Sequence, residues 1–400
     1  MLDKLILLFK KTGFGKLKNL NSDKNFKIII LLIVITTLSL SLITYGGSNK
    51  EKTRLAEVNQ QIQKELSDLK SQDQYKINKD LEAKITSIEK TYDQAVEVYE
   101  KMIDLNDQEK DTDEYEQLFT KGLSLLSDRN YASAEASLAS LNIKIDKETA
   151  QTPLSNLVGS TANISANNTP PGTGYSRQRV KTDFGEFVVD IVAADLNSTR
   201  VIVDTASDGD CRDNCPVLPL GDYVSRNGAF AGVNGSYFCP ASYPSCAGKA
   251  NSFDTLLMNK NKVYFNSDNN IYSNVPAVIF SGNSARFVGR SLEWGRDTGI
   301  DAVLANQPLL VSGGNVVFGG DDEVKRAGAG SRSFVGTTGS TVYIGVVHGV
   351  NAAQMARVLH AMGIQNALNL DSGGSTALWS GGYRVGPGRN IPNALLFVGK

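Results

Sequence analysis

The sequence predicts an α+β protein in which a helical region comes before a domain of largely antiparallel sheets with few helices. Apolar residues recur at helical spacing in the first part of the chain, and they form short runs of β-type residues further on. A stretch rich in Thr, Ser, Asn, Pro and Gly separates the two parts. A run of helices followed by a run of strands is typical of an α+β chain.

The chain of 400 residues begins with a basic segment, residues 1–27, which carries seven lysines and two aspartates. Residues 28–45 follow without any charge, and as a helix they would measure roughly 27 Å, close to the bilayer core of about 30 Å. We therefore expect a transmembrane helix at residues 28–45. A buried core helix is the alternative, but no polar face interrupts the run.

The charge distribution also predicts the orientation of this helix. Because the lysines precede the span, residues 1–27 are expected in the cytoplasm and everything after Gly46 outside the cell. Tyr45 to Ser48 matches a signal-peptidase site poorly, which favours an uncleaved signal anchor over a cleaved signal peptide. The predicted location is the cell membrane, with one crossing. The net charge of -1 gives no reason to expect nucleic acid as a partner.

Residues 50–147 form the predicted helical region. An amphipathic stripe runs from Leu55 to Ile103 and is broken near Ser71–Gln74, which predicts a coiled coil or a folded-back hairpin. A second apolar face, from Tyr115 to Leu141, is interrupted by a turn at Ser127–Asn130. It is similar to a tetratricopeptide helix pair, but we favour a plain helical hairpin because a single repeat is seldom stable. This region is a predicted stalk that could also mediate self-association.

Residues 148–179 form the predicted linker, and residues 180–400 the predicted C-terminal domain. The clearest helix of this domain is expected at Ala352–Met362, before Gly363. The predicted strands cover residues 187–192, 201–203, 230–233, 263–265, 277–280, 303–304, 341–347 and 395–398.

The four cysteines all lie in the part expected outside the cell, where disulfides form. Four cysteines can pair in three ways. The local pairs Cys211 with Cys215 and Cys239 with Cys246 are preferred. A zinc site is the alternative, but spacings of three and six intervening residues do not fit the usual zinc patterns, and neither histidine is near in sequence.

The most informative stretch runs from Ala367 to Leu378. An apolar run, which predicts a buried strand, ends at Asp371 and is followed by a turn of Ser and Gly. Asp371 is also the only Asp or Glu between Val324 and Lys400. A lone carboxylate at a strand end, beside backbone that a ligand can approach closely, is a candidate functional residue. The alternative is an Asp that only caps the turn.

This stretch resembles the L-D-G-G-G-S signature of the phosphodiester glycosidase family. The resemblance covers about Phe184 to the C-terminus, and four other pieces occur in the family order. They are Val233–Phe238 (family N-G-G-F-F), Ser331–Gly336 (family R-T-A-V-G), Val346–Gly349 (family V-D-G) and Arg389–Leu395. The resemblance implies a sheet-rich fold and a hydrolase that cleaves a sugar-1-phosphodiester in an envelope or extracellular glycan.

The leaving group of such a substrate is a phosphate monoester. An enzyme for this reaction must therefore mainly neutralise the phosphate, stabilise an oxocarbenium-like centre and position a water molecule. Arg332 is the predicted phosphate ligand, because its planar fork matches phosphate oxygens. A surface arginine in a loop is the alternative. Asp371 could stabilise the anomeric centre, act as base for water, or hold a hard cation such as Ca²⁺ or Mg²⁺. Gly373, Gly374 and Ser375 could offer backbone N–H groups to an anion.

The other predicted site residues come from the remaining pieces of the resemblance. Asn234 suits a sugar hydroxyl or acetamide, unless Asn234-Gly235 only forms a hairpin turn. His348 replaces the Asp usual in the family, and it could instead make only a structural hydrogen bond. Ser236 and Ser372 replace glycines, which costs on the order of 1 kcal/mol if the backbone there is left-handed. The predicted substrate-binding residues are Gly235, Ser236, His348, Ser372, Gly373, Gly374, Ser375, Arg389 and Asn393.

Two other functional classes remain open from the sequence. The first is a non-catalytic glycan-binding module on a helical stalk, which would bind glycans without turnover. The second is an envelope scaffold whose helical region is the working part, and which would tolerate the loss of Asp371.

Overall fold

The computed structural model describes residues 30–39, 49–71, 73–106, 111–155, 164, 166–266, 273–297, 299–321 and 323–400. The chain divides into two compact units, Met1–Thr86 and Ser87–Lys400, and the boundary falls inside helix α4 (Asp73–Asn106). The second unit therefore contains the last part of α4 as well as the sheets. The predicted site residues all belong to this second unit.

The first unit contains helix α3 (Asn49–Ser71) and the beginning of α4, with the predicted interruption between them. Residues 30–39 are helical, but the rest of the predicted span 28–45 lies outside the described residues. No helix in the described part of the chain is both long enough and apolar enough to cross a bilayer. The transmembrane helix at residues 28–45 stays a prediction.

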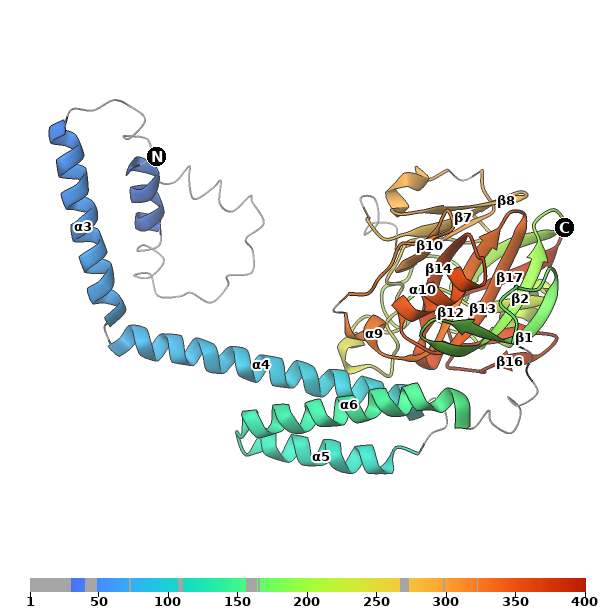
Figure 1. Cartoon of the computed structure of the whole chain (residues 1–400), viewed down its shortest axis with the longest axis horizontal. Helices are drawn as coiled ribbons and strands as arrows, with labels where there is room; N and C mark the ends of the chain where they lie inside the picture. The colour runs from blue at the N-terminus through green and yellow to red at the C-terminus, as the bar shows by residue number, and fades with distance from the viewer. Residues whose placement is uncertain are drawn as a thin grey trace. The chain divides into compact units, whose positions relative to one another are not determined.

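The second unit begins with a bundle of the last part of α4, α5 (Asp113–Ser127) and α6 (Tyr131–Ser155). Val98, Leu105, Leu141 and Ile145 are among the buried residues of its core. Lys101 of α4 pairs with Asp146 of α6 at 2.8 Å. α5 and α6 form the predicted hairpin, which lies along the last part of α4 (Figure 1).

The remainder of the second unit is built on three antiparallel sheets. The seven-stranded sheet has the order β1 (Gly174–Thr182), β2 (Gly185–Asp195), β13 (Thr341–Val350), β12 (Gly330–Thr338), β14 (Asn366–Ser372), β10 (Leu309–Ser312), β11 (Asn315–Val316). One five-stranded sheet has the order β16 (Tyr383–Val385), β15 (Leu378–Ser380), β4 (Ala231–Asn234), β17 (Asn393–Gly399), β3 (Thr199–Thr205). The other has the order β6 (Tyr264–Phe265), β5 (Leu257–Met258), β9 (Ala302–Ala305), β7 (Ala277–Ser281), β8 (Ser284–Val288).

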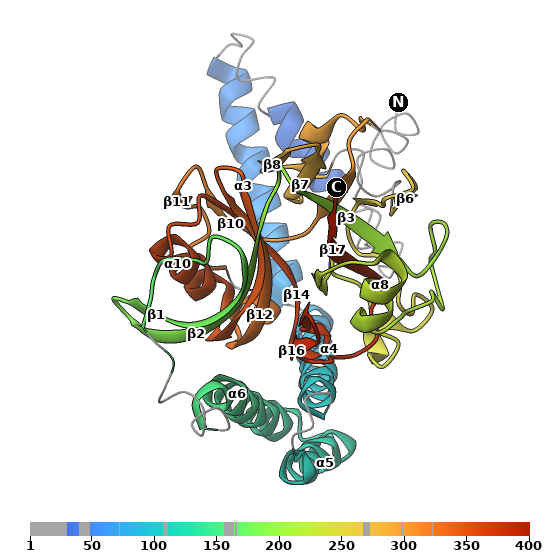
Figure 2. The ribbon, with the colours of Figure 1, turned by 90° about the vertical axis from the view of Figure 1, so that its right-hand side faces the viewer.

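The sheets pack face to face between two helices. The main core joins one face of the seven-stranded sheet to the two smaller sheets through residues such as Val346, Leu370 and Leu395. Helix α10 (Ala352–Ala361) covers the opposite face of the seven-stranded sheet. Helix α8 (Leu220–Asn227) covers the outer face of the β3–β17 sheet. Figure 2 shows α10 and α8 on opposite sides of the sheets.

The predicted α+β class with antiparallel C-terminal sheets is confirmed. Each predicted strand overlaps an observed one, and the predicted helix at 352–362 is α10, which starts with a capping box of Asn351 and Gln354. The predictions missed helix α8 and seven strands, which are β1, β5, β8, β10, β11, β15 and β16. β1 lies at the edge of its sheet, and its polar residues give no alternating apolar pattern.

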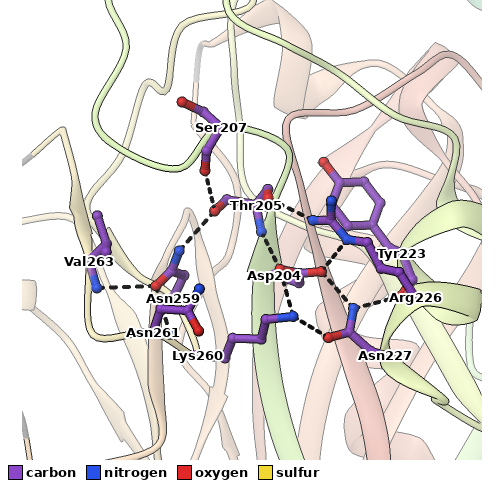
Figure 3. Close-up of polar contacts among 10 residues, drawn as sticks. All are labelled: Asp204, Thr205, Ser207, Tyr223, Arg226, Asn227, Asn259, Lys260, Asn261 and Val263. Atoms are coloured by element: carbon purple, nitrogen blue, oxygen red, sulfur yellow. Dashed lines mark hydrogen bonds and ion pairs between the residues drawn. The ribbon is translucent and has the colours of Figure 1, made fainter.

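A buried polar network ties the β3–β17 sheet to its neighbours (Figure 3). The Asp204 carboxylate at the end of β3 accepts from Arg226 Nε of α8 at 2.6 Å and from Asn227 Nδ2 at 2.6 Å. Lys260, in the turn after β5, approaches the same carboxylate at 3.2 Å. Because the Asp204 side chain is only 4% exposed, these partners take the place of the water that would otherwise solvate the carboxylate.

We expect Asp204→Ala to destabilise the second unit by about 3–5 kcal/mol, since it leaves Arg226 and Lys260 without their shared anion. Thermal and urea unfolding of the full chain measure this loss. Asp183→Ala is the matched control, because the Asp183 carboxylate is 77% exposed and pairs only at the surface with Arg357. Its expected cost is below about 1 kcal/mol. Equal costs for the two variants would contradict this account of Asp204.

Candidate active site

Asp371 lies at the end of β14, where the apolar strand leaves the core. Leu368 and Leu370 of this strand are fully buried and fix its position. The backbone N–H of Asp371 donates to the carbonyl of Gly235 at 2.9 Å, which joins β14 to the end of β4. The carboxylate Oδ1 accepts from the Ser372 N–H at 2.9 Å. Asp371 therefore lies at a strand end, as the sequence pattern predicted, and the structure also places it at the junction of two sheets.

The surroundings of Asp371 alter its acidity. Burial of the carboxyl raises its pKa to about 7, although the Ser375 hydroxyl, the Arg389 charge and the Ser372 N–H favour the ionised form. The neighbouring Asp104 also raises the pKa. A carboxyl with a pKa near 7 exists in both protonation states at neutral pH, which suits a group that accepts or donates a proton during a reaction.

The turn after Asp371 is shaped to receive an arginine. Gly373 has a φ of +65°, a left-handed conformation that favours glycine. A Cβ on Gly374 would lie 2.3 Å from Nη2 of Arg389, so only glycine leaves room for the guanidinium here. The Arg389 N–H also donates to the Gly374 carbonyl at 2.8 Å. The glycines thus place the positive charge of Arg389 beside Asp371.

Arg389 is paired with a carboxylate from the helical bundle. Asp104, near the end of α4, forms a short ion pair with the Arg389 guanidinium and accepts from the Tyr243 hydroxyl at 2.7 Å. The Arg389 guanidinium also lies 5.0 Å from the centre of the Tyr243 ring. A second α4 carboxylate, that of Glu100, bonds the side chain and backbone of Ser245. Two acidic residues of α4 therefore dock onto the loop between Cys239 and Cys246.

These groups line one cavity of about 320 Å³. The sheet domain contributes strand ends and loops, and the bundle contributes α4 and α6. Among the polar residues and glycines that line it are Glu100, Lys101, Asp104, Asp146, Tyr237, Tyr243, Asp254, Glu323, Gly328, Gly330, Ser331, Arg332, Asp371, Ser372, Gly373, Ser375 and Arg389. Seven acidic and three basic residues are among the described residues that line the cavity, so an anionic substrate group would have to lie against the basic ones, of which Arg389 is next to Asp371.

Arg332 lines this cavity, but its guanidinium is bonded to main-chain carbonyls. It donates to Val350 at 3.0 Å, to Gly328 at 2.5 Å and to Arg326 at 3.3 Å. The side chain is almost completely buried, and this burial lowers the pKa of Arg332 from its usual value. These contacts favour a structural role, in which Arg332 holds the loop 326–330. Its predicted contact with phosphate remains a prediction.

Asn234 lies beneath Asp371, outside the lining of the cavity. Its Nδ2 donates to the Asp371 carbonyl at 2.6 Å, and its Oδ1 accepts from the Ser333 hydroxyl at 2.6 Å and from the Ala377 N–H. The side chain is fully buried. The structure therefore disagrees with the predicted contact between Asn234 and a sugar, because its amide is bonded to protein atoms. Asn234 positions the backbone of Asp371.

Three other predicted residues pack in the same layer. Asn393 of β17 accepts the Ser236 N–H at 2.9 Å, and both residues are buried. A Cβ on Gly235 would lie 1.7 Å from Oδ1 of Asn393, so this contact requires glycine. Neither Ser236 nor Ser372 has a positive φ, so the serines carry no left-handed strain. Ser372, Gly373 and Ser375 line the cavity, whereas Gly235, Ser236 and Asn393 support it from below.

His348 of β13 is buried among polar partners. Its Nε2 lies 2.7 Å from Asp190 Oδ2, and its Nδ1 lies 2.9 Å from the Ser331 hydroxyl. His348 itself does not line the cavity, but Ser331 does. Any effect of His348 on a substrate would therefore be indirect, through the Ser331 hydroxyl.

The disulfides Cys211–Cys215 and Cys239–Cys246 are both present, which confirms the preferred pairing. The second of them closes the loop that carries Tyr243. Within the described residues, no group of three or more His, Cys, Asp or Glu side chains is arranged to hold a metal ion. A Ca²⁺ or Mg²⁺ ion at Asp371 stays a prediction.

The sequence predictions missed Asp104, Tyr243, Asp190 and Ser331 as members of the site. Tyr243 could have been noticed, because it lies between two cysteines that were expected to pair. Asp104 gave no signal, since it is one of many acidic residues on an amphipathic helix. Ser331 belongs to the motif Ser331–Gly336, but nothing in this motif distinguishes it from its neighbours.

We expect Gly374→Ala to weaken anion binding at Arg389 by about tenfold or more, because the added methyl group would displace the guanidinium. Titration calorimetry with inorganic phosphate and with a sugar-1-phosphate measures the change. Gly319→Ala is the control, since a Cβ at Gly319 meets nothing within 4 Å. Unchanged binding in Gly374→Ala would show that the position of Arg389 does not depend on this glycine.

The comparison with known protein families agrees with the functional class that this site suggests, a hydrolase. Residues 227–398 match the family model described as phosphodiester glycosidase, a family of hydrolases. This match confirms the resemblance seen in the sequence for residues 227–398, which are less than half of the chain. The helices α4–α6, strand β1 and Asp190 lie outside the matched residues.

Two solved structures are similar to the chain at low sequence identity. The catalytic domain of zebrafish N-acetylglucosamine-1-phosphodiester alpha-N-acetylglucosaminidase, auto-inhibited by pro-peptide, has 16% identity and a TM-score of 0.44, with 58% of this chain and 85% of that chain covered. A hypothetical protein from Synechocystis has 12% identity and a TM-score of 0.41, with 56% of this chain covered. This chain spans 62% of the Synechocystis protein. No curated protein matches the sequence significantly.

Proposed function

We propose that the chain hydrolyses the C1–O bond of a sugar-1-phosphodiester and releases a free sugar and a phosphate monoester. The observation that carries this proposal is the pairing, in one cavity, of Asp371 with a pKa raised to about 7 and Arg389 with its fixed positive charge. The family match supports the same reaction class.

In this reaction the ionised Asp371 accepts a proton from water as the water oxygen attacks C1. The bond between C1 and the phosphate oxygen breaks, and the monoester leaves as an anion without needing a proton. Arg389 balances the charge that develops on this leaving group. Asp371 therefore activates the attacking water, and Arg389 stabilises the phosphate leaving group.

The binding of phosphate at Arg389 requires a rearrangement of the present contacts. The Asp104 carboxylate already holds the guanidinium and the Tyr243 hydroxyl, and it lies against Gly373. A phosphodiester also carries one negative charge and accepts hydrogen bonds through its oxygens. Substrate phosphate and Asp104 thus compete for the same donors.

The test is to incubate the full chain with a sugar-1-phosphodiester in ¹⁸O-labelled water. We expect the label in the sugar and none in the phosphate monoester, since C1–O cleavage is proposed. Label in the phosphate would show P–O cleavage and reject the mechanism. Glycan binding without any turnover would favour the glycan-binding module instead.

We also propose that the chain acts outside the cytoplasm, anchored in the membrane by residues 28–45, on an envelope or extracellular glycan. The lysines before this apolar segment and the two disulfides support this location. Protease added to intact cells should release a soluble piece that carries the sheets. Full protection of that piece, together with its release after cell lysis, would contradict the orientation.

A further inference from the structure

A continuous chain of polar side chains crosses four neighbouring strands of the seven-stranded sheet. It begins on β1, where the Tyr175 hydroxyl donates to Asp190 at 2.6 Å and Arg177 approaches the same carboxylate at 3.3 Å. It continues from Asp190 on β2 to His348 on β13 and ends at Ser331 on β12. Ser331 is the member of this chain that lines the cavity.

Asp190 is completely buried in this arrangement. A carboxylate without any contact with water is costly, and replacing such a buried network by apolar residues often stabilises a protein. The side chain faces the apolar core between the sheets, next to Val192 and Val346 on the same sheet face. The stability of the fold therefore does not by itself explain why an acidic residue occupies position 190.

The two nitrogens of His348 have different partners, and these partners define the tautomer. Asp190 Oδ2 is an acceptor at 2.7 Å, so the neutral imidazole carries its proton on Nε2. Nδ1 is then unprotonated and accepts from the Ser331 hydroxyl, whose Oγ lies 2.9 Å away. A hydroxyl, a base within hydrogen-bond reach and an acid that orients the base form the arrangement that activates a serine.

The position of Ser331 is also well defined. It stands in a bulge where the pairing of β12 with β13 shifts between Gly330 and Arg332. A bulge of this kind redirects a side chain and often occurs beside active sites. The Thr376 hydroxyl donates to the Ser331 carbonyl at 3.1 Å. The half-buried Ser331 is thus presented to the cavity beside the glycine-rich loop 328–330.

We propose that Ser331, His348 and Asp190 form a second catalytic centre in this cavity, which hydrolyses an acyl ester. The Ser331 oxygen attacks the carbonyl carbon while its proton passes to Nδ1 of His348. The alcohol then leaves with that proton, and an acyl group remains on Ser331. Water attacks this acyl group, gives its proton to His348, and releases the carboxylic acid as the serine regains its hydrogen. The reaction consumes only the ester and water.

The test is to treat the full chain with a fluorophosphonate and to locate the modified residue by peptide mass spectrometry. We expect one stoichiometric modification, on Ser331, and hydrolysis of 4-nitrophenyl acetate with a burst. Ser331→Ala should lose both, whereas the control Ser284→Ala, an exposed serine on β8, should lose neither. The absence of modification at Ser331 in the wild type would overturn the proposal.

A second variant separates activation of the serine from mere accessibility. His348→Gln can still reach Asp190, but it places no base beside Ser331, so modification should slow by about 100-fold or more. The melting temperature identifies a variant that has unfolded. If a folded His348→Gln reacts at the wild-type rate, His348 is not the base. The proposed glycosidase reaction does not use Ser331, so either activity can fail without the other.

Discussion

Asp371→Asn is expected to lower kcat on a sugar-1-phosphodiester by about 10³-fold, since the variant keeps the shape of the side chain but cannot accept a proton. Steady-state kinetics of the full chain measure this loss. Asp183→Asn is the control, because Asp183 is exposed and pairs at the surface with Arg357. Near-wild-type turnover by Asp371→Asn would remove this residue from the mechanism.

The pH dependence gives an independent readout of the same residue. Because the base is the ionised carboxyl and burial raises its pKa to about 7, kcat should rise with pH through this value and level off above it. The effect on stability has the opposite direction. The folded state keeps the Asp371 proton up to about pH 7, whereas the unfolded chain loses it near pH 4, so stability is lost as pH rises through this window.

Asp371→Asn should therefore gain melting temperature relative to the wild type at pH 8, and gain less at pH 5. This result separates a lost catalytic group from a damaged fold, since a damaged fold would lower the melting temperature at both pH values.

Arg389→Ala is expected to lower kcat/KM by about 100-fold on the phosphodiester, because the leaving group loses its charged partner. On an aryl glycoside without phosphate the loss should be small. Arg384→Ala is the control, since Arg384 lies on β16 and does not line the cavity. Equal losses of Arg389→Ala on both substrates would show a general defect instead of a phosphate contact.

Asp104→Asn tests the proposed competition for Arg389. Removal of the Asp104 charge should lower the KM for the phosphodiester by about tenfold, with little change on the uncharged substrate. A raised KM on the phosphodiester would show that Asp104 assists substrate binding instead of opposing it.

The sequence carried enough information for most of the sheet domain because its strands have strong local signals. The alternation of apolar residues, the apolar run before Asp371 and the helix pattern at 352–362 each follow from neighbours in the chain. Strand β1 lacked such a signal, because its position depends on pairing with β2 at the edge of the sheet.

The site was predictable only where its residues belong to a local motif. Asp371, its glycines and Arg389 follow from such motifs, and the structure brings them together. Asp104 lies 285 residues from Arg389 in the chain, and only the packing of the bundle makes them neighbours. The predicted contact of Asn234 with a sugar has the opposite basis. Its motif is local in the sequence, but its burial depends on strands that are distant in the sequence.

The boundary between the two compact units has a practical consequence for expression. A recombinant fragment that starts at the segment after α6 would contain every strand of the sheet domain, yet it would lack α4 and α6. Such a fragment would leave the apolar contact of Ile103 with the Cys239–Cys246 loop uncovered, and Arg389 without its carboxylate. Kinetic constants measured on this truncated version would describe a more open cavity. A fragment that keeps the complete pocket wall must include α4 from Glu97 onward, and a fragment that keeps the whole second unit begins at Ser87.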